Sequence, residues 1–204
     1  LGCQKTLTDG SVIVTDPEPV FTVSPDTSCL PFTVTTSNTS LDVDNFEWIY
    51  SSGTISNPTD YTPTFAITDT GYHTVSLVIT DIYGCTDTAS HTFLATDIFP
   101  AANTTVTDGC RPLTVQFTDL TTVFPDSIVS WAWNFGGSEG TSTSQNPVHV
   151  YQDIGVYTPI LIVTNSYGCT KQITLPQIET TFPSVSYTPS LTYACTGQDI
   201  LFDN

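Results

Sequence analysis

The feature of this sequence that most constrains its fold is a segment that occurs twice and ends in Tyr-Gly-Cys. One copy runs from Gly71 to Cys85 and the other from Gly155 to Cys169. In both, apolar residues alternate along the segment, which is the period of a strand with one buried face, and a turn containing Gly follows. The two Cys are 84 residues apart (169 − 85), and Cys3 follows another Gly 82 residues earlier (85 − 3). The sequence therefore predicts an array of repeats.

The repeated segment divides the chain into two full repeats with a partial repeat on each side. The predicted boundaries are the end (last strand) of a preceding repeat at 1–16, repeat one at 17–96, repeat two at 97–180 and the start of a further repeat at 181–204. We therefore expect an internal fragment of a longer protein. Only the short, Pro-containing segment from Asp97 to Pro100 joins the two full repeats, which predicts a rod rather than a flexible string.

The pattern within each repeat is typical of an all-β sandwich. Short runs rich in Thr, Val, Ile and aromatic residues recur with Pro, Gly and Asn between them, and no helical periodicity is present. This pattern predicts an antiparallel β-sandwich in each repeat, with Trp48 and Trp133 at the centres of the two cores. In each repeat the residues after Gly-Cys are expected to form one last strand, at 4–15, 86–95 and 170–178.

The charge and cysteine content limit the partners and the location of the chain. The formal net charge is −17, from 20 acidic and 3 basic residues. This charge argues against nucleic acid and anionic membranes as partners, because both need Lys and Arg. No apolar run is long enough to span a bilayer. The 6 Cys at regular places favour an oxidising location, extracellular or at the cell surface.

Three runs of residues carry a resemblance to a known family. They are Trp-Asn-Phe-Gly at 133–136, Asn-Pro-Val-His-Val-Tyr at 146–151, and the Gly-x-Tyr segment that leads to Cys169. These runs resemble the PKD domain (polycystic kidney disease repeat), an immunoglobulin-like β-sandwich, so the fold implied is a series of tandem PKD-type sandwiches. Repeat one departs from the pattern at Tyr50 and His73, and Gly137 stands where the motif has an acidic residue.

The resemblance extends to the setting of the Cys residues. The added Cys-x-Pro and Gly-Cys pairs are similar to those of PKD arrays in very large secreted proteins of Bacteroidota, including adhesins used in gliding motility. What this resemblance implies is a spacer or an adhesive stalk. It implies no particular ligand.

Catalytic signatures are scarce. His73, His91 and His149 each lie within a strand pattern, and the chain has neither Gly-x-Ser-x-Gly nor His-Glu-x-x-His. No two Cys form a Cys-x-x-Cys pair, which disfavours a zinc site. We therefore expect no enzymatic activity and no required cofactor.

Clustered Asp residues make calcium the candidate cation. In the expected topology, loops at one pole of each repeat gather acidic and amide side chains, and a Ca²⁺ ion taking 6–8 oxygens would relieve their repulsion. The alternative is that these carboxylates are solvated and keep the rod soluble. The candidates are Asp16, Asp42, Asp44 and Asp81 for repeat one, and Asp97, Asp126 and Asn165 for repeat two.

The simplest disulfide pairing joins the two Cys inside each repeat, Cys29–Cys85 and Cys110–Cys169, and the alternative is a pair between repeats. The number of strands decides between them. If strands alternate through a seven-stranded sandwich, Cys29 and Cys85 lie at opposite poles, about 30 Å apart, whereas a disulfide needs Cα atoms within roughly 7 Å. The far pole of repeat one faces the pole of repeat two that holds Cys169, so the sequence predicts the inter-repeat pair Cys29–Cys169. The other Cys would pair outside the fragment, two upstream and two downstream: Cys3, Cys85, Cys110 and Cys195.

The expected function is that of a structural stalk or spacer segment in a large extracellular repeat protein, a surface adhesin or filament, whose partners are neighbouring repeats of the same chain. The alternative is a carbohydrate- or protein-binding module attached to a secreted enzyme. Its partners would be surface glycans or other surface proteins, with Trp131 or Tyr83 stacking on a sugar. Two Asp-Ser/Thr-aliphatic triplets also resemble the O-glycosylation signal of Bacteroidota, which makes Thr88 and Ser127 candidate O-linked sites.

Overall fold

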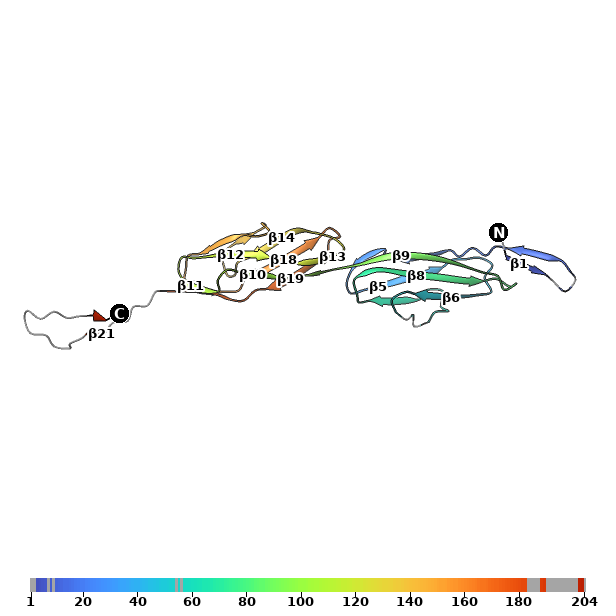
Figure 1. The fold of residues 1–204 in the computed structure, drawn as a ribbon, viewed down its shortest axis with the longest axis horizontal. Helices are drawn as coiled ribbons and strands as arrows, with labels where there is room; N and C mark the ends of the chain where they lie inside the picture. Colours follow the sequence, from blue (N-terminus) through green and yellow to red (C-terminus); the bar gives the residue numbers. More distant parts are fainter. Residues whose placement is uncertain are drawn as a thin grey trace, which may run out of the picture. The chain divides into compact units, whose positions relative to one another are not determined.

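The structure is a computed structural model that describes residues 3–6, 8, 10–53, 55, 57–182, 188–189 and 202–203. All regular elements in these ranges are β-strands, from β1 to β22, and they pair mostly antiparallel (Figure 1). The predicted fold class, an all-β protein of immunoglobulin type, is confirmed. Within the same ranges there is no helix long and apolar enough to cross a membrane.

The chain divides into two compact units that do not follow the predicted repeat boundaries. Unit 1 contains Leu1–Pro100, Thr121–Ser130 and Val163–Lys171. Unit 2 contains Ala101–Leu120, Trp131–Ile162 and Gln172–Asn204. Two segments of predicted repeat two are therefore part of the unit built mainly from repeat one.

Two sheets form most of unit 1. The first has the order β3-β5-β7, and the second has the order β13-β9-β8-β6, with β4 parallel to β9 (Figure 1). The strands of the first sheet are β3 (Phe21–Ser24), β5 (Phe32–Asn38) and β7 (Thr64–Ile67). Those of the second are β4 (Thr27–Cys29), β6 (Asn45–Tyr50), β8 (Gly71–Thr80), β9 (Thr86–Phe99) and β13 (Thr122–Phe124).

The core of unit 1 contains Trp48, as the aromatic alternation predicts. Along β6, Phe46 and Trp48 are buried while Glu47 and Ile49 are exposed, because successive side chains of a strand point to opposite faces. The Trp48 indole N–H donates a hydrogen bond to the Asp60 carbonyl at 3.0 Å. The rest of this core is aliphatic and aromatic: Val34, Phe65, Ile67, Val75, Leu77, Ile79, Phe93 and Ala95.

Unit 2 contains the second Trp-centred core. Trp133 is 1% exposed, and its indole N–H donates to the Ser144 carbonyl at 3.0 Å. The sheet orders are β10-β12-β16, β11-β20-β17 and β15-β14-β18-β19. The strands of these sheets are β10 (Ala102–Thr104), β11 (Asp108–Cys110), β12 (Leu113–Asp119), β14 (Ile128–Asn134), β15 (Thr141–Ser142), β16 (Val148–Tyr151), β17 (Gly155–Tyr157), β18 (Ile160–Asn165), β19 (Thr170–Thr174) and β20 (Ile178–Thr181). Residues 128–130 of β14, 163–165 of β18 and 170–171 of β19 are counted with unit 1.

Two of the predicted last strands are wrong as single strands. In place of one strand at 4–15, β1 (Cys3–Thr6) and β2 (Val12–Thr15) pair antiparallel as a hairpin, and Gly10 between them has a φ of 86°. The Asp-Gly pair there is a turn signal that outweighs the strand pattern. Residues 170–178 divide into β19 and the start of β20, and Pro176, which has no N–H for a ladder, lies between them.

The segment predicted as a linker is part of a strand. β9 continues to Phe99, and its residues 97–99 pair antiparallel with β13, while residues 94–96 pair parallel with β4. The backbone groups of Asp97–Phe99 are thus tied into a ladder. Of the predicted third repeat, only β21 (Thr188–Pro189), β22 (Phe202–Asp203) and the first residues lie in the described part of the chain.

Candidate functional site

Cys169 is held by a tight turn that follows β18. The Asn165 side-chain Oδ1 accepts hydrogen bonds from the backbone N–H of Tyr167 at 3.1 Å and of Cys169 at 2.9 Å. Gly168, with φ of 81°, occupies the left-handed region that favours glycine. The Asx side chain and the glycine together fix the position of the Cys169 backbone.

The first Tyr-Gly-Cys run forms the same turn around Asp81. Its Oδ1 accepts from the backbone N–H of Tyr83 at 2.8 Å and of Cys85 at 2.9 Å, and Gly84 has φ of 85°. The repeated sequence is therefore explained by the turn itself. An Asx residue four positions before Cys closes the turn, and the Gly before Cys allows the positive φ that the turn needs.

Cys29 and Cys169 form a disulfide, the pair that strand topology predicts. Their Cα atoms are 5.6 Å apart, and 140 positions separate them in the sequence. β4 ends at Cys29, and the Asn165 turn presents Cys169, which is 2% exposed. The bond lies within unit 1 and joins residues of predicted repeats one and two.

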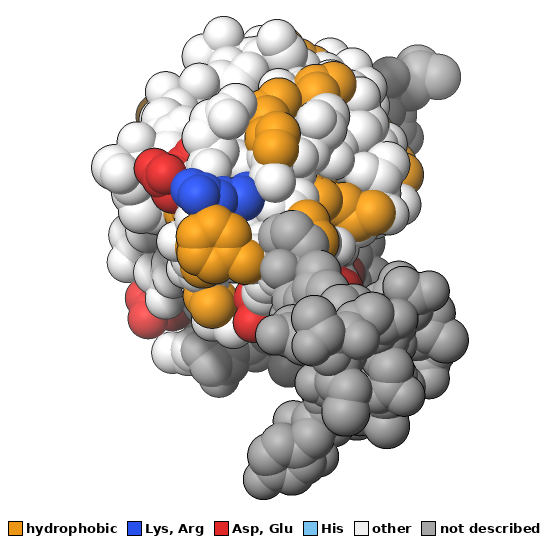
Figure 2. Space-filling model, turned by 90° about the vertical axis from the view of Figure 1, so that its left-hand side faces the viewer, with side chains coloured by type: hydrophobic (Ala, Val, Ile, Leu, Met, Phe, Trp, Pro, Cys, Tyr) orange, Lys and Arg blue, Asp and Glu red, His pale blue; other side chains and the backbone are white. Residues whose placement is uncertain are grey.

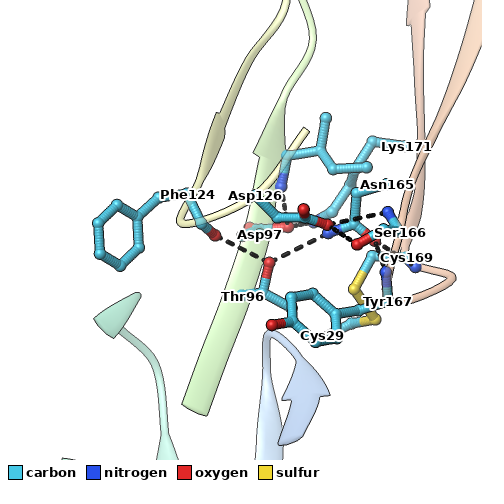
Figure 3. The surroundings of a disulfide bond; sticks show 11 residues. Cys29, Thr96, Asp97, Phe124, Asp126, Asn165, Ser166, Tyr167, Cys169 and Lys171 are labelled. Carbon is cyan, nitrogen blue, oxygen red and sulfur yellow. Dashed lines mark hydrogen bonds and ion pairs between the residues drawn. A yellow bond between two sulfur atoms is a disulfide. The ribbon is translucent and has the colours of Figure 1, made fainter. Parts of the chain in front are cut away.

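A chain of buried hydrogen bonds lies beside the disulfide (Figure 3). The Asn165 side-chain amide donates to the Thr96 hydroxyl at 3.1 Å, and that hydroxyl donates to the Phe124 carbonyl at 2.8 Å. Thr96 is 0% exposed and Asn165 is 1% exposed, so each bond replaces one that water would otherwise make. These hydrogen bonds connect β9, β13 and the Asn165 turn.

Two acidic side chains complete this group, which we call the disulfide cluster (Figure 3). Asp97 forms an ion pair with Lys171 at 3.1 Å and accepts a hydrogen bond from the Ile98 N–H at 2.9 Å. Asp126 accepts from the backbone N–H of Ser166 at 3.0 Å and from its hydroxyl, and the hydroxyl contact is the main reason why the pKa of Asp126 lies below its ordinary value. The cluster consists of Cys29, Thr96, Asp97, Phe124, Asp126, Asn165, Ser166, Cys169 and Lys171.

The remaining Cys residues require one correction. Cys85 is disulfide-bonded in the structure, so its partner lies within the chain, whereas the sequence placed that partner upstream of residue 1. The strand count correctly separated Cys85 from Cys29, but it did not anticipate the β1–β2 hairpin. Cys110 is an exposed, free thiol. The side chains of Cys3 and Cys195 lie outside the described residues.

The candidate calcium ligands fall into two groups. Asp16, Asp42 and Asp81 line one pocket of about 490 Å³, and Asp44 is not part of its lining. Asp97 and Asp126 instead bind Lys171 and Ser166. Among the residues that the structure describes, no three His, Cys, Asp or Glu side chains are grouped as a metal site.

Calcium binding stays a prediction, and the Asp16 pocket is where it can be tested. If Ca²⁺ binds there, the melting temperature should rise with its concentration, by about 2.7 kcal/mol of stability at 100 times Kd. Asp42→Asn should abolish the rise while it keeps a residue that tolerates the φ of 56° at this position. Asp44→Asn is the matched control. An unchanged melting temperature in millimolar Ca²⁺ would contradict calcium binding.

The carboxylate of Asp81 predicts a specific acid sensitivity. Its pKa lies below the ordinary 3.8, first because of the Thr15 hydroxyl and also because of backbone N–H groups of the turn. The Thr15 hydroxyl and Asp81 Oδ2 are both buried, and neither makes a hydrogen bond of ordinary geometry. The hydroxyl therefore lowers the pKa of Asp81 by lying close to the carboxylate. Since folding lowers this pKa, the stability it provides is present above pH 3.8 and is lost as the pH falls through the folded-state value.

We therefore expect Asp81→Asn to flatten the loss of stability in acid. Asn should be accepted, because Asn165 closes the second turn in the same way. Urea unfolding between pH 7 and pH 2.5 measures the effect, with the exposed residue Asp87, changed to Asn, as control. Equal acid sensitivity of wild type and Asp81→Asn would show that Asp81 does not contribute.

The other candidate residues are placed as follows. Thr88 on β9 and Ser127 before β14 are both exposed. The Trp131 indole N–H donates to Asp119 at 2.7 Å, and Tyr83 is partly buried in the Asp81 turn. His73 is 2% exposed and contacts the Tyr50 hydroxyl and the Asp69 carbonyl at 2.8 and 3.0 Å, so it is a core residue, as its strand position predicts.

Thr96, Lys171 and β13 were not predicted as parts of this cluster. Lys171 is one of only 3 basic residues, which was a usable signal, since a rare cation in an acidic chain favours a nearby carboxylate. Thr96 offered no such signal, because Thr is common throughout the chain and its importance depends on the β4 and β13 pairings. β13 is too short to stand out as a periodic run.

The fold and the cluster define an all-β protein of immunoglobulin type with a disulfide between distant parts of its sequence. Residues 99–178 match the family model of the PKD domain. The resemblance read from the sequence is thus supported over these residues.

Solved structures of similar proteins include two PKD domains. The PKD1 domain of Vibrio anguillarum Epp is 28% identical, with a TM-score of 0.35, over 41% of this chain and 95% of that one. The PKD1 domain from the Vibrio cholerae metalloprotease PrtV is 26% identical, with a TM-score of 0.35, over 40% and 93%. The fibronectin(III)-like modules of Clostridium thermocellum CbhA are 14% identical, with a TM-score of 0.37, over 79% and 94%.

Proposed function

We propose that this chain is a structural stalk or spacer segment of a large extracellular repeat protein, a cell-surface adhesin or filament. The observation that carries the proposal is the Cys29–Cys169 disulfide within its buried cluster. A bond between positions 140 residues apart, set beside two consecutive ladders of β9, fastens one predicted repeat to the next. Such a bond serves mechanical continuity and takes no part in a reaction.

The way the cluster resists separation follows from its bonds. A pull that moves the Asn165 turn away from β4 meets the covalent S–S bond, whereas hydrogen bonds alone can break one by one. The Thr96 hydroxyl and the Asp97–Lys171 pair hold the neighbouring strand in register while the disulfide bears load. Burial of Thr96 and Asn165 keeps water from competing for these bonds.

Composition and family support the location and the absence of catalysis in this proposal. Disulfides persist in oxidising surroundings such as the cell exterior. The PKD domain, which residues 99–178 match, is a non-catalytic module of immunoglobulin type. A net charge of −17 keeps such a chain soluble and repels anionic polymers. We assign the chain to the cell surface on these grounds, with its own neighbouring repeats as partners.

The proposal is tested by asking whether the chain binds anything and whether its parts move together. A stalk segment should give no specific signal on a glycan array. Small-angle scattering should show a narrow distribution of lengths, some 60–70 Å for two full repeats at about 3.3 Å per strand residue. Specific glycan binding would instead favour a carbohydrate-binding module attached to a secreted enzyme. A broad length distribution under oxidising conditions would contradict a stiff spacer.

A further inference from the structure

Cys110 lies in a backbone setting that repeats the setting of Cys29. β4 pairs parallel with β9, so that Thr27, Ser28 and Cys29 oppose Leu94, Ala95 and Thr96. β11 pairs parallel with β20, so that Asp108, Gly109 and Cys110 oppose Glu179, Thr180 and Thr181. The ladder places Cys110 opposite Thr181 just as it places Cys29 opposite Thr96.

The hydrogen bonds that flank the two ladders also correspond. Leu30 N–H donates to the Thr96 carbonyl at 3.1 Å, and Arg111 N–H donates to the Thr181 carbonyl at 3.2 Å. At the other end, the Leu94 N–H donates to the backbone carbonyl of Asp26 at 2.9 Å, and the Glu179 N–H donates to the backbone carbonyl of Thr107 at 2.8 Å. The chain therefore builds the same Cys/Thr pair twice, once in each unit.

The two pairs differ in what covers them. Cys29 is bonded to Cys169, and Thr96 is 0% exposed and receives the Asn165 amide. Cys110 is an exposed, free thiol, and Thr181 is exposed as well. In the first pair a complete Asx-x-Tyr-Gly-Cys turn satisfies both side chains, whereas in the second pair both side chains face outward.

The surroundings of Cys110 offer room for such a turn. An open pocket of about 680 Å³ borders Cys110, Thr181, Glu179 and Val156, and Val156 is 59% exposed. Next to it the Arg111 guanidinium lies 4.4 Å from the centre of the Phe182 ring, which is itself 60% exposed. Figure 2 views the molecule from the side on which β11 lies in Figure 1 and shows basic atoms in contact with hydrophobic ones there. The open pocket, with polar side chains and the exposed Val156 at its border, leaves space for a docked turn.

We propose that β11 and β20 form an acceptor site for an Asx-x-Tyr-Gly-Cys turn, which a following repeat supplies and which becomes linked to Cys110. The proposal rests on the proposed function, because it requires a further repeat. The Asx amide of the turn donates to the Thr181 hydroxyl, as Asn165 donates to Thr96. An Asp in this place accepts from the hydroxyl instead, so the site suits both residues that open a Tyr-Gly-Cys turn in this chain, Asp81 and Asn165.

Linkage of the two Cys is an oxidation and needs a disulfide as oxidant. One thiolate attacks oxidised glutathione and releases one glutathione thiolate, which leaves a mixed disulfide on the protein. The second thiolate then attacks that protein sulfur and releases the second glutathione. Two protein thiols become one disulfide, and one glutathione disulfide becomes two thiols. The reaction needs no residue beyond the two Cys once the turn is docked.

The test supplies the missing turn by tandem duplication. A second copy of residues 97–181 is inserted after Thr181, so that the new Thr181–Asp97 junction repeats the natural Thr96–Asp97 junction. The copy carries Cys110→Ser, so that only the original Cys110 can react. After refolding with oxidised and reduced glutathione, a non-reducing digest is expected to contain a Cys110–Cys169 peptide in an amount similar to the Cys29–Cys169 peptide. Cys110→Ser in the original copy should remove the first peptide and leave the second.

The outcomes separate this inference from the proposed function. If Cys29–Cys169 is recovered and Cys110–Cys169 is not, the acceptor site is refuted and the stalk proposal stands. If neither is recovered from a chain that melts cooperatively, both fail. Linkage between separate molecules, seen as a covalent dimer, would contradict the proposal that the following repeat of the same chain supplies the turn.

A second measurement applies if the longer chain does not fold. A peptide of residues 160–174, with Cys169 activated as its thionitrobenzoate disulfide, is reacted with the original chain. The rate of thionitrobenzoate release is measured, and the rate obtained with the Cys110→Ser variant is subtracted from it. Reaction about tenfold faster than that of activated glutathione, slowed by Thr181→Val, supports the site. Equal rates for peptide and glutathione would overturn it.

Discussion

The double variant Cys29→Ala/Cys169→Ala is expected to lose about 3–5 kcal/mol of the free energy of unfolding. The disulfide closes a loop of 140 positions, and cross-links that close long loops remove much of the entropy of the unfolded chain. The variant leaves its Thr96 and Asn165 hydrogen bonds in place, so the loss reports mainly on the bond itself. Urea unfolding followed by circular dichroism measures the change of midpoint.

A matched control for this variant is Cys110→Ala. Cys110 is exposed and free, so its replacement is expected to change the free energy of unfolding by less than about 0.5 kcal/mol. The wild-type chain in reductant should be destabilised at least as much as the double variant, because reduction also breaks the disulfide of Cys85. If the double variant and the wild type unfold at the same urea concentration, the disulfide contributes no stability, and the proposal that it fastens the two predicted repeats together is wrong.

Trp48→Ala should lose a similar amount, about 3–5 kcal/mol, for a different reason. Trp48 is 2% exposed, its ring meets Phe21 edge-on at 5.1 Å, and its N–H is bound to the Asp60 carbonyl. Truncation leaves a large cavity that the surrounding β-sheets cannot close, and it removes the partner of a loop carbonyl. Near-ultraviolet circular dichroism and urea unfolding measure the loss.

The neighbouring residue supplies the control for Trp48. Ile49 is on the same strand but on its outer face, with 50% of its surface exposed. Ile49→Ala is expected to cost well under half as much, because little of its apolar surface leaves water on folding. Comparable losses for the two variants would mean that β6 does not present Trp48 to the core.

Alternation and strand counting explain why the fold and the main disulfide could be predicted. The spacing of Phe46 and Trp48 alone predicts one buried face, since the side-chain period of a strand is two. The parity of the strand count sets the pole of every connection, and it separated Cys29 from Cys85 while bringing Cys29 to Cys169. These inferences need no side-chain contacts, only the order of strands.

The parts that sequence could not reveal depend on pairings between distant segments. Thr96 is an ordinary strand residue until β4 and β13 flank β9, after which its hydroxyl lies between Asn165 and Phe124. The segment from Asp97 to Phe99 has the composition of a linker, and only pairing with β13 makes it a strand. The β1–β2 hairpin was missed because its apolar pattern resembles the last strands of the full repeats.

Non-reducing peptide mapping of the oxidised chain tests the central claim most directly. Only 3 Lys and Arg residues are present, so the digestion needs a protease that cleaves at acidic or aromatic residues. The account predicts a peptide that joins Cys29 to Cys169 and disappears on reduction. Recovery of a peptide that joins Cys29 to Cys85 would contradict it.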